Sequence, residues 1–309
     1  MSLTLADIGV ADALLPYRTQ RWDNGGHEQH YLDEGSGDPV IMVHGNPSWC
    51  FLWRNAIGAL RADYRCIVPD HIGCGLSSRP TDADYEFTFE RRVADFGRLM
   101  DHLALDRPVT IVAHDWGGMI SMAWAVQNPG RVGRICLFNT GAFPNPHIKR
   151  LPWQLWLVRN TPVGAALVSG LNAFAVGAAY TAVTRKALTP ELRAAFVAPY
   201  AKRENRLATL RFVQDIPLAA DDRGYGLVAA TGAGLKQFAA TPVFLGWGLK
   251  DFVFDESFLK TFEQAWPQAE VHRVADGGHY VLEDAGDELL PLLADFLRRN
   301  PPVTGSAAP

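Results

Sequence analysis

The sequence contains few cysteines and no long run of basic residues. Cys50, Cys66, Cys74 and Cys136 are scattered, without the spacing of a metal site. We therefore expect reduced thiols and a cytoplasmic protein. The formal net charge is −4, so nucleic acid is not an expected partner. The first 20 residues show no basic segment followed by an apolar one, so we expect no secretory signal.

Charge is also absent from residues 163–182, a stretch long enough to raise the question of a membrane span. However, the stretch is rich in Ala, Gly, Ser and Asn. Its large apolar residues recur at a one-sided helical spacing, at Val163, Leu167, Leu171 and Phe174. We predict a helix that covers a cavity rather than a transmembrane span, and the sequence leaves membrane contact of this surface open.

The 309 residues are 48% hydrophobic, enough for a large core. Strand and helix patterns alternate up to Asn139, which is typical of a parallel, doubly wound sheet. The predicted strands are 27–33, 39–43, 64–68, 109–113, 134–139, 242–247 and 270–274, and the predicted helices are 53–60, 89–102, 119–127, 256–266 and 287–298. We predict an α/β core of residues 1–140 and 238–299, an inserted helical cap of residues 141–237, and a disordered tail of residues 300–309.

The strand at 109–113 leads into Asp115, with Ala113 two residues before it and Gly117 two residues after it. This pattern is the nucleophile elbow of the α/β-hydrolase fold, where small residues permit a sharp turn between strand and helix. An Asp nucleophile forms an ester with the carbon that it attacks, and it suits displacement at an sp³ carbon. Asp is also common in turns and at helix N-caps, so the assignment depends on its partners.

Two of those partners follow later strands. Asp251 comes after the strand at 242–247, and His279 lies in a Gly-rich loop after the last strand. The order nucleophile, acid, histidine is that of the α/β hydrolases. We predict that His279 exchanges protons and that Asp251 fixes its tautomer and charge, with Asp255 as a second candidate for the acid. A carboxylate could also have followed the strand at 134–139, but Asn139 occupies that position.

An anion site is predicted from Asn46, which follows the second strand, and from Trp116, which follows Asp115. Their backbone N–H groups would form an oxyanion hole. The amide of Asn46 and the indole N–H of Trp116 would add two side-chain donors for a leaving halide or carboxylate. Trp116 could instead serve only core packing.

These motifs resemble those of the haloalkane dehalogenases. The matching segments are His44-Gly45-Asn46-Pro47 with Trp53-Arg54, His114-Asp115-Trp116-Gly117-Gly118, Trp247-Gly248 with Asp251, and Gly278-His279. The resemblance implies Asp115 as nucleophile, His279 as base, Asp251 as supporting acid, and Asn46 with Trp116 as the halide clamp. The pairing of Asp251 with Asn46 is similar to that of the third dehalogenase subgroup.

A closer resemblance, which includes the cap, is to the β-lactone decarboxylases of bacterial long-chain olefin biosynthesis. The segments that carry it are 69–77, 209–218, 250–255 and 278–285. It implies conversion of a cis-3,4-dialkyl-oxetan-2-one to a cis-alkene and CO₂, and assembly with a thiolase, a ligase and a reductase. Apolar cap residues would accommodate a hydrophobic long-chain substrate, or would only dock the cap on the sheet. No metal or nucleotide motif is present, so no cofactor is expected.

Three alternatives stay open. A haloalkane dehalogenase would release halide and an alcohol. An epoxide hydrolase would need cap tyrosines, for which Tyr180 and Tyr200 are the candidates before Tyr225. A non-catalytic lipid-binding relative is disfavoured because nucleophile, acid, histidine and anion site are all present. For the decarboxylase, Asp115 could attack either the oxygen-bearing carbon or the carbonyl carbon of the lactone.

Overall fold

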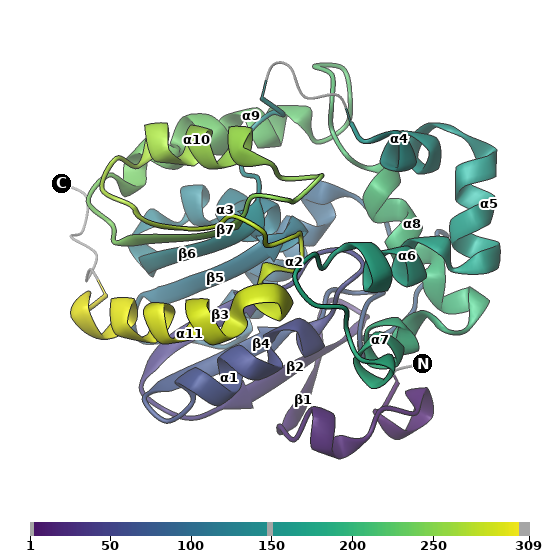
Figure 1. Ribbon diagram of the computed structural model, residues 1–309, viewed down its shortest axis with the longest axis horizontal. Helices are drawn as coiled ribbons and strands as arrows, with labels where there is room; N and C mark the ends of the chain where they lie inside the picture. The colour runs from purple at the N-terminus through teal and green to yellow at the C-terminus, as the bar shows by residue number, and fades with distance from the viewer. Residues whose placement is uncertain (1–2, 147–150, 303–309) are drawn as a thin grey trace.

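A computed structural model describes residues 3–146 and 151–302. Its centre is an eight-stranded sheet in the order β1-β2-β4-β3-β5-β6-β7-β8 (Figure 1). The strands are β1 (Thr19–Asp23), β2 (Glu28–Glu34), β3 (Asp38–Val43), β4 (Tyr64–Pro69), β5 (Val109–Asp115), β6 (Val132–Thr140), β7 (Val243–Gly248) and β8 (Glu270–Val274). From β4 to β8 all neighbouring strands are parallel, whereas β2 is antiparallel to both β1 and β4. The predicted α/β fold with a mostly parallel sheet is confirmed.

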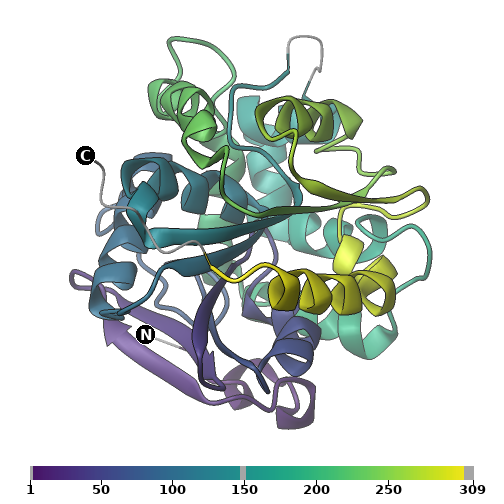
Figure 2. The same cartoon turned by 90° about the vertical axis from the view of Figure 1, so that its left-hand side faces the viewer.

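Helices cover both faces of the sheet because both faces of its central strands are apolar. Along β3, Val40 and Met42 pack into one hydrophobic cluster and Ile41 and Val43 into another. This alternation is expected where successive side chains of a strand point to opposite faces. In Figure 2 the yellow helix α11 (Val281–Arg299) lies on one side of the sheet, on the same face as α1 (Arg54–Leu60), and the other helices of the core lie on the opposite face. The helices of the core are α1, α2 (Phe89–His102), α3 (Trp116–Gln127), α9 (Tyr225–Gly234), α10 (Glu256–Ala265) and α11. Helix α9 packs against α3, although its residues fall within the segment 141–237 that is predicted as cap.

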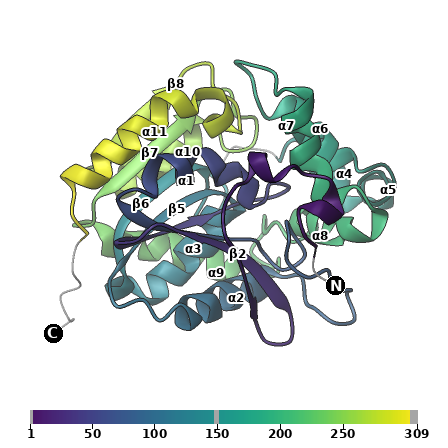
Figure 3. The same ribbon diagram turned by 90° about the horizontal axis from the view of Figure 1, so that it is seen from below.

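The cap lies at one end of the molecule, where α4 to α8 gather in both Figure 1 and Figure 3. Its helices are α4 (Trp153–Asn160), α5 (Pro162–Leu171), α6 (Ala173–Thr181), α7 (Pro190–Val197) and α8 (Leu207–Gln214). They occur between β6 and β7, so the chain leaves the sheet beside the nucleophile strand and returns to it after the cap.

The single helix predicted over residues 163–182 is wrong, because two helices occupy this stretch. α5 ends at Leu171, its C-cap Asn172 adopts the left-handed conformation (φ 55°), and α6 lies at an angle of 80° to α5. Asn tolerates this conformation better than most residues. Within residues 3–146 and 151–302, no single helix is long and apolar enough to cross a membrane, although this bent pair passes the test of length and composition.

Two further differences concern the ends of the chain. Strand β1 was not predicted, because its residues are largely exposed and show no apolar alternation. Helix α11 begins at Val281 rather than at residue 287, with a non-helical residue at Ala285. Of the tail predicted to be disordered, residues 303–309 lie outside the described residues.

Candidate active site

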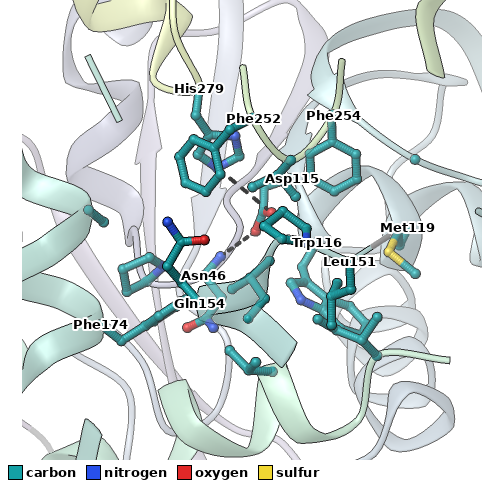
Figure 4. A pocket seen from close by; sticks show the side chains of 18 of the residues that line it. Asn46, Asp115, Trp116, Met119, Leu151, Gln154, Phe174, Phe252, Phe254 and His279 are labelled. Atoms are coloured by element: carbon teal, nitrogen blue, oxygen red, sulfur yellow. Dashed lines mark hydrogen bonds and ion pairs between the residues drawn. The ribbon is translucent and has the colours of Figure 1, made fainter. Parts of the chain in front are cut away.

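Asp115 stands at the sharp turn between β5 and α3, with a positive φ (φ 52°, ψ −130°). Such a conformation is costly for a residue with a side chain and is held by its surroundings. Gly117 makes the turn possible, because a Cβ at this position would lie 2.0 Å from the carbonyl oxygen of Val43. Helix α3 therefore approaches β3 closely, and the carboxylate of Asp115 points toward the pocket beneath the cap (Figure 4).

Backbone donors bind the carboxylate of Asp115. The N–H of Asn46 donates to Oδ1 at 2.6 Å, and the N–H of Trp116 also donates to this carboxylate. The side chain of Asn46 donates from Nδ2 to the carbonyl oxygen of Thr209 in α8, at 3.0 Å. One of the two amide hydrogens of Asn46 is therefore used to hold the cap, and the other is left for a ligand.

His279 lies on the opposite side of Asp115 from Asn46. Its Nε2 is 3.8 Å from Oδ2 of Asp115, and its Nδ1 is 2.8 Å from Oδ2 of Asp251 (Figure 4 shows the contact with Asp115). Asp251 also accepts a hydrogen bond from the N–H of Val253. Asp115, His279 and Asp251 are all buried, and the fold brings these three predicted residues together from three strand ends.

The alternative acid, Asp255, has a different position. It is the N-cap of α10 and accepts from the N–H of Ser257 at 2.9 Å. Asn139, at the end of β6, accepts from the N–H of Gly248 and donates to the carbonyl oxygens of Gly248 and Phe254. Its amide therefore braces the loop that carries Asp251.

Burial and neighbouring charges shift the pKa values at this centre. Burial raises the pKa of Asp115 to about 6, and the charge of His279 and the two N–H donors limit the rise. Burial alone would lower the pKa of His279, but the charge and hydrogen bond of Asp251 raise it above its ordinary value. Burial alone would likewise raise the pKa of Asp251, and His279 lowers it. Two carboxylates therefore face one imidazole, and only Asp115 has a raised pKa.

Sequence reasoning did not assign a role to His114, which precedes the nucleophile. Its Nε2 is 2.8 Å from the carbonyl oxygen of His279, and its ring packs against the ring of His279 with centroids 4.6 Å apart. Burial lowers the pKa of His114 to about 3, so the ring is neutral and Nε2–H donates. His114 thus positions the His279 loop. Its place in the His-Asp-Trp motif was the available signal.

A largely apolar cavity of about 310 Å³ lies above Asp115. Core residues on its floor include Asn46, Trp116 and His279, and its apolar walls include Phe174, Val213 and Phe254 from the cap and loops (Figure 4). Several lining residues are also exposed, namely Gln154, Ala173, Thr181 and Phe252, so the cavity opens to solvent between α4, α6 and the loop after β7. Among the described residues, the indole N–H of Trp116 has no hydrogen-bond partner and remains available to a ligand.

Among the described residues, one group could hold a metal ion by its donor set, namely His30, Cys50 and Asp70. The oxygens of Asp70 already accept from the backbone of Cys50 at 2.7 Å and of Leu76 at 2.8 Å, and one of them is 2.8 Å from Nδ1 of His30. Burial raises the pKa of the Cys50 thiol well above its ordinary value, which opposes formation of a thiolate ligand. The arrangement is a hydrogen-bonded cluster that braces the loop after β4.

Comparison with known proteins agrees with this geometry. Residues 38–286 match the model of the alpha/beta hydrolase fold family. The chain is 48% identical over 288 residues to the cis-3-alkyl-4-alkyloxetan-2-one decarboxylase of Shewanella oneidensis, covering 93% of this chain and 91% of that protein. It belongs to this decarboxylase family within the α/β hydrolases.

A second member of the decarboxylase family, from Xanthomonas campestris pv. campestris, is 46% identical over 278 residues, with 88% of this chain and 92% of that protein covered. The fold is also that of the haloalkane dehalogenases. The crystal structure of haloalkane dehalogenase DbeA from Bradyrhizobium elkani matches with a TM-score of 0.82 at 25% identity, covering 91% of this chain and 98% of the other. The resemblance to both groups predicted from the motifs is confirmed.

Proposed function

We propose that this protein removes CO₂ from cis-3-alkyl-4-alkyloxetan-2-ones, which are four-membered lactones with two alkyl groups, and releases cis-alkenes. The observation that carries the proposal is the identity of 46–48% to two proteins named for this substrate, over nearly the whole chain including the cap. The pocket supports this proposal, because an apolar cavity with a few polar groups at one end suits a hydrophobic substrate with a small polar ring.

In the first step, we propose that Oδ2 of Asp115 attacks C4 of the lactone, the ring carbon that bears the oxygen. A C4–O bond to Asp115 forms, the ring C4–O bond breaks, and its electron pair stays on a free carboxylate at C3. Oδ1 is held by the N–H of Asn46, so Oδ2 is the oxygen left for attack. The indole of Trp116 and the remaining amide hydrogen of Asn46 would donate to the new carboxylate.

In the second step, the bond between C3 and the carboxylate carbon breaks and CO₂ leaves. Its electrons form the C3=C4 double bond, and the C4–O bond to Asp115 breaks and regenerates the carboxylate. No water or proton is consumed. Attack by Asp115 inverts the configuration at C4. Fragmentation then requires the bond from C3 to the carboxylate carbon and the bond from C4 to Asp115 to be antiperiplanar. Inversion followed by anti fragmentation amounts to syn loss of CO₂ from the ring, so a cis-lactone gives a cis-alkene.

His279 has a different task in this scheme than in a hydrolase. A raised pKa favours the protonated ring, which cannot take a proton from water. In its protonated form the ring places a positive charge 3.8 Å from Oδ2 of Asp115, and this charge stabilises the carboxylate before attack and after release. Asp251 keeps the ring oriented through Nδ1. We therefore propose that His279 and Asp251 set charge and orientation, and that they do not deliver hydroxide.

A haloalkane dehalogenase is the second candidate, favoured by the shared fold and by a carboxylate nucleophile beside Trp116. One experiment separates the two. The purified protein is incubated with a cis-dialkyl β-lactone and, separately, with 1,2-dibromoethane, and Asp115→Ala serves as the control. Alkene formed by the wild type and abolished in the variant is the expected result. Bromide release with intact lactone would overturn the proposal and return His279 to the role of a base.

Two further proposals concern the cell. Four buried free thiols support a cytoplasmic location, which localisation of a tagged chain would test. We also propose assembly with the ligase, reductase and thiolase that make the lactone, because an apolar intermediate dissolves poorly in water. Co-purification of the four proteins at physiological salt would test it.

A further inference from the structure

The exposed apolar side chains of this molecule are concentrated on three consecutive helices. Among the described residues, eight large apolar side chains are exposed, and six of them lie on α4, α5 and α6. The six are Trp153, Trp156, Val163, Leu171, Val176 and Tyr180, which we call the cap patch. Trp153, Leu171 and Tyr180 are 71%, 72% and 63% exposed. Single exposed apolar residues are ordinary, whereas a group that includes two tryptophans marks an interaction surface.

The cap patch adjoins the mouth of the pocket. Gln154 and Thr181 line the mouth, and they are the sequence neighbours of Trp153 and Tyr180. On α6, Ala173 and Gly177 line the pocket while Val176 and Tyr180 are exposed beside them. Helices α4 and α6 both contact α8, and Figures 1 and 3 show α4, α5 and α6 together at the outer end of the cap.

Charge is distributed unevenly between the cap and the core. Residues 141–224, which end where α9 begins, contain 11 Lys and Arg against five Asp and Glu, a net charge of +6, although the whole chain is at −4. The remaining residues therefore carry −10. Residues 163–182, which supply α5 and α6, carry no charge. The guanidinium of Arg193 lies 4.7 Å from the ring centre of Tyr180, so one positive charge borders the cap patch. Three other arginines of the segment, Arg185, Arg211 and Arg223, form ion pairs with acids of the core.

We propose that the cap patch docks on an anionic lipid bilayer, with the pocket mouth turned toward the membrane. Trp and Tyr favour the interface between lipid headgroups and acyl chains. Helices that lie flat on a bilayer bury their apolar side chains there, and basic residues around them are attracted to anionic headgroups. The negative core would remain directed away from the membrane. Charge complementarity of this kind favours a lipid surface over a second copy of the chain, whose cap would also be positive.

Docking would let a dialkyl lactone enter the pocket from the bilayer without crossing water. This consequence rests on the proposed function, but the docking itself does not. Trp153, Trp156 and Leu171 do not line the pocket, so their substitution leaves the catalytic centre intact. The structure also offers a matched control, because Leu292 on α11 is an exposed leucine on the core.

The experiment measures flotation of the purified protein with vesicles of phosphatidylcholine containing one quarter phosphatidylglycerol, and with vesicles of phosphatidylcholine alone. We expect binding to the anionic vesicles that is roughly tenfold tighter than to the neutral ones and that weakens with salt. Trp153→Ser/Trp156→Ser should weaken binding by roughly tenfold or more. Leu171→Ser should weaken it roughly threefold, and Leu292→Ser should leave it unchanged.

Absence of binding to anionic vesicles would overturn the proposal, as would equal loss of binding in Leu171→Ser and Leu292→Ser. Lipid-free self-association that Leu171→Ser abolishes would also overturn it and assign the patch to a protein interface. Turnover separates docking from function. We expect Trp153→Ser/Trp156→Ser to convert a short, water-soluble lactone at the wild-type rate and a vesicle-borne long-chain lactone more slowly. If the wild type converts neither lactone, the proposed function fails while the vesicle result still decides docking.

Discussion

Gly45 lies directly against the carboxylate of Asp115, and a Cβ on Gly45 would come within 2.0 Å of Oδ1 and 2.5 Å of Cγ. The backbone at residues 45 and 46 can approach the nucleophile only because residue 45 has no side chain. This approach allows the N–H of Asn46 to reach Oδ1 at 2.6 Å. The loop after β3 therefore sets which oxygen of Asp115 is held and which is left for attack.

Gly45→Ala should strongly reduce turnover while the fold is retained. The new methyl group must displace the carboxylate, which breaks its bond to Asn46 and misplaces Oδ2. We expect kcat/KM to fall by roughly 100-fold or more, as for loss of an oxyanion-hole donor. The measurement is alkene formation, with circular dichroism as the check on folding. Gly226→Ala is the matched control, because a Cβ there meets no atom within 4 Å. Wild-type activity in Gly45→Ala would contradict the geometry.

Asp115→Asn should stabilise the protein at neutral pH while it removes activity. The folded pKa of Asp115 is raised to about 6 from 3.8, so above pH 6 the fold carries a buried charge that the unfolded chain solvates. Two units correspond to about 3 kcal/mol. The buried charge lowers the free energy of unfolding fully above pH 6 and not at all below pH 4. The stabilisation of Asp115→Asn relative to the wild type should therefore grow between these two values.

Urea unfolding at pH 4.5 and pH 7.5 measures this effect. The free energy of unfolding of Asp115→Asn should exceed that of the wild type by about 1–3 kcal/mol at pH 7.5 and by less at pH 4.5. Asp63→Asn, at an exposed position, is the control and should differ from the wild type by less than about 0.5 kcal/mol at both values. A gain that is larger at the lower pH would refute the assignment of the raised pKa to Asp115.

The rate should also depend on the ionisation of Asp115. Only the carboxylate attacks, so kcat/KM should fall as the pH drops through about 6, about tenfold per unit below it. The charge of His279 lowers the pKa of Asp115, so His279→Gln should move this limb to higher pH. The pH dependence of kcat/KM for the wild type and for His279→Gln measures the position of this limb. Circular dichroism at pH 5 checks that both proteins remain folded. A limb near pH 4 in the wild type would argue against a buried carboxylate.

The strand ends could be predicted from the sequence because buried parallel strands are continuous apolar runs. That pattern predicts Asp115, Asp251 and His279 at one edge of the sheet, and in the structure His279 lies 3.8 Å from Asp115 and 2.8 Å from Asp251. The bond from Asn46 to Thr209 could not be predicted, because it joins residues 163 positions apart and depends on how the cap packs. No periodic signal encodes such a contact.

Local breaks in the cap were harder to predict than the core. The apolar spacing from Val163 to Phe174 suggested one continuous helix, yet Asn172 divides it into two. Apolar periodicity indicates which residues share one face of a helix, but it does not show where the backbone turns. Val163 and Leu171 then prove to be exposed rather than buried. Of the residues in this pattern, Phe174 lines the cavity, whereas Val163 and Leu171 form part of an exposed apolar surface.

The last prediction concerns a buried ion pair that supports the histidine loop. Arg54, at the start of α1, donates from both terminal nitrogens to Glu283, at 2.6 and 2.8 Å, and both side chains are over 90% buried. Glu283 lies in the first turn of α11, four residues after His279. Either single substitution leaves one buried charge unpaired. Glu283→Gln and Arg54→Met should each lower the free energy of unfolding by about 3–5 kcal/mol.

The double substitution Arg54→Met/Glu283→Leu distinguishes stability from positioning. Two apolar side chains of similar size need no desolvation of charge, so we expect the double variant to recover most of the stability lost in the single variants. Urea unfolding measures that recovery, and kcat measures the second role. If the pair also fixes the start of α11, and thereby the ring of His279 against Asp251, the stable double variant should still turn over more slowly than the wild type. Wild-type kcat in a stable double variant would mean that the pair contributes only to stability. A loss of less than about 1 kcal/mol in the free energy of unfolding of the single variants would contradict the burial of the pair.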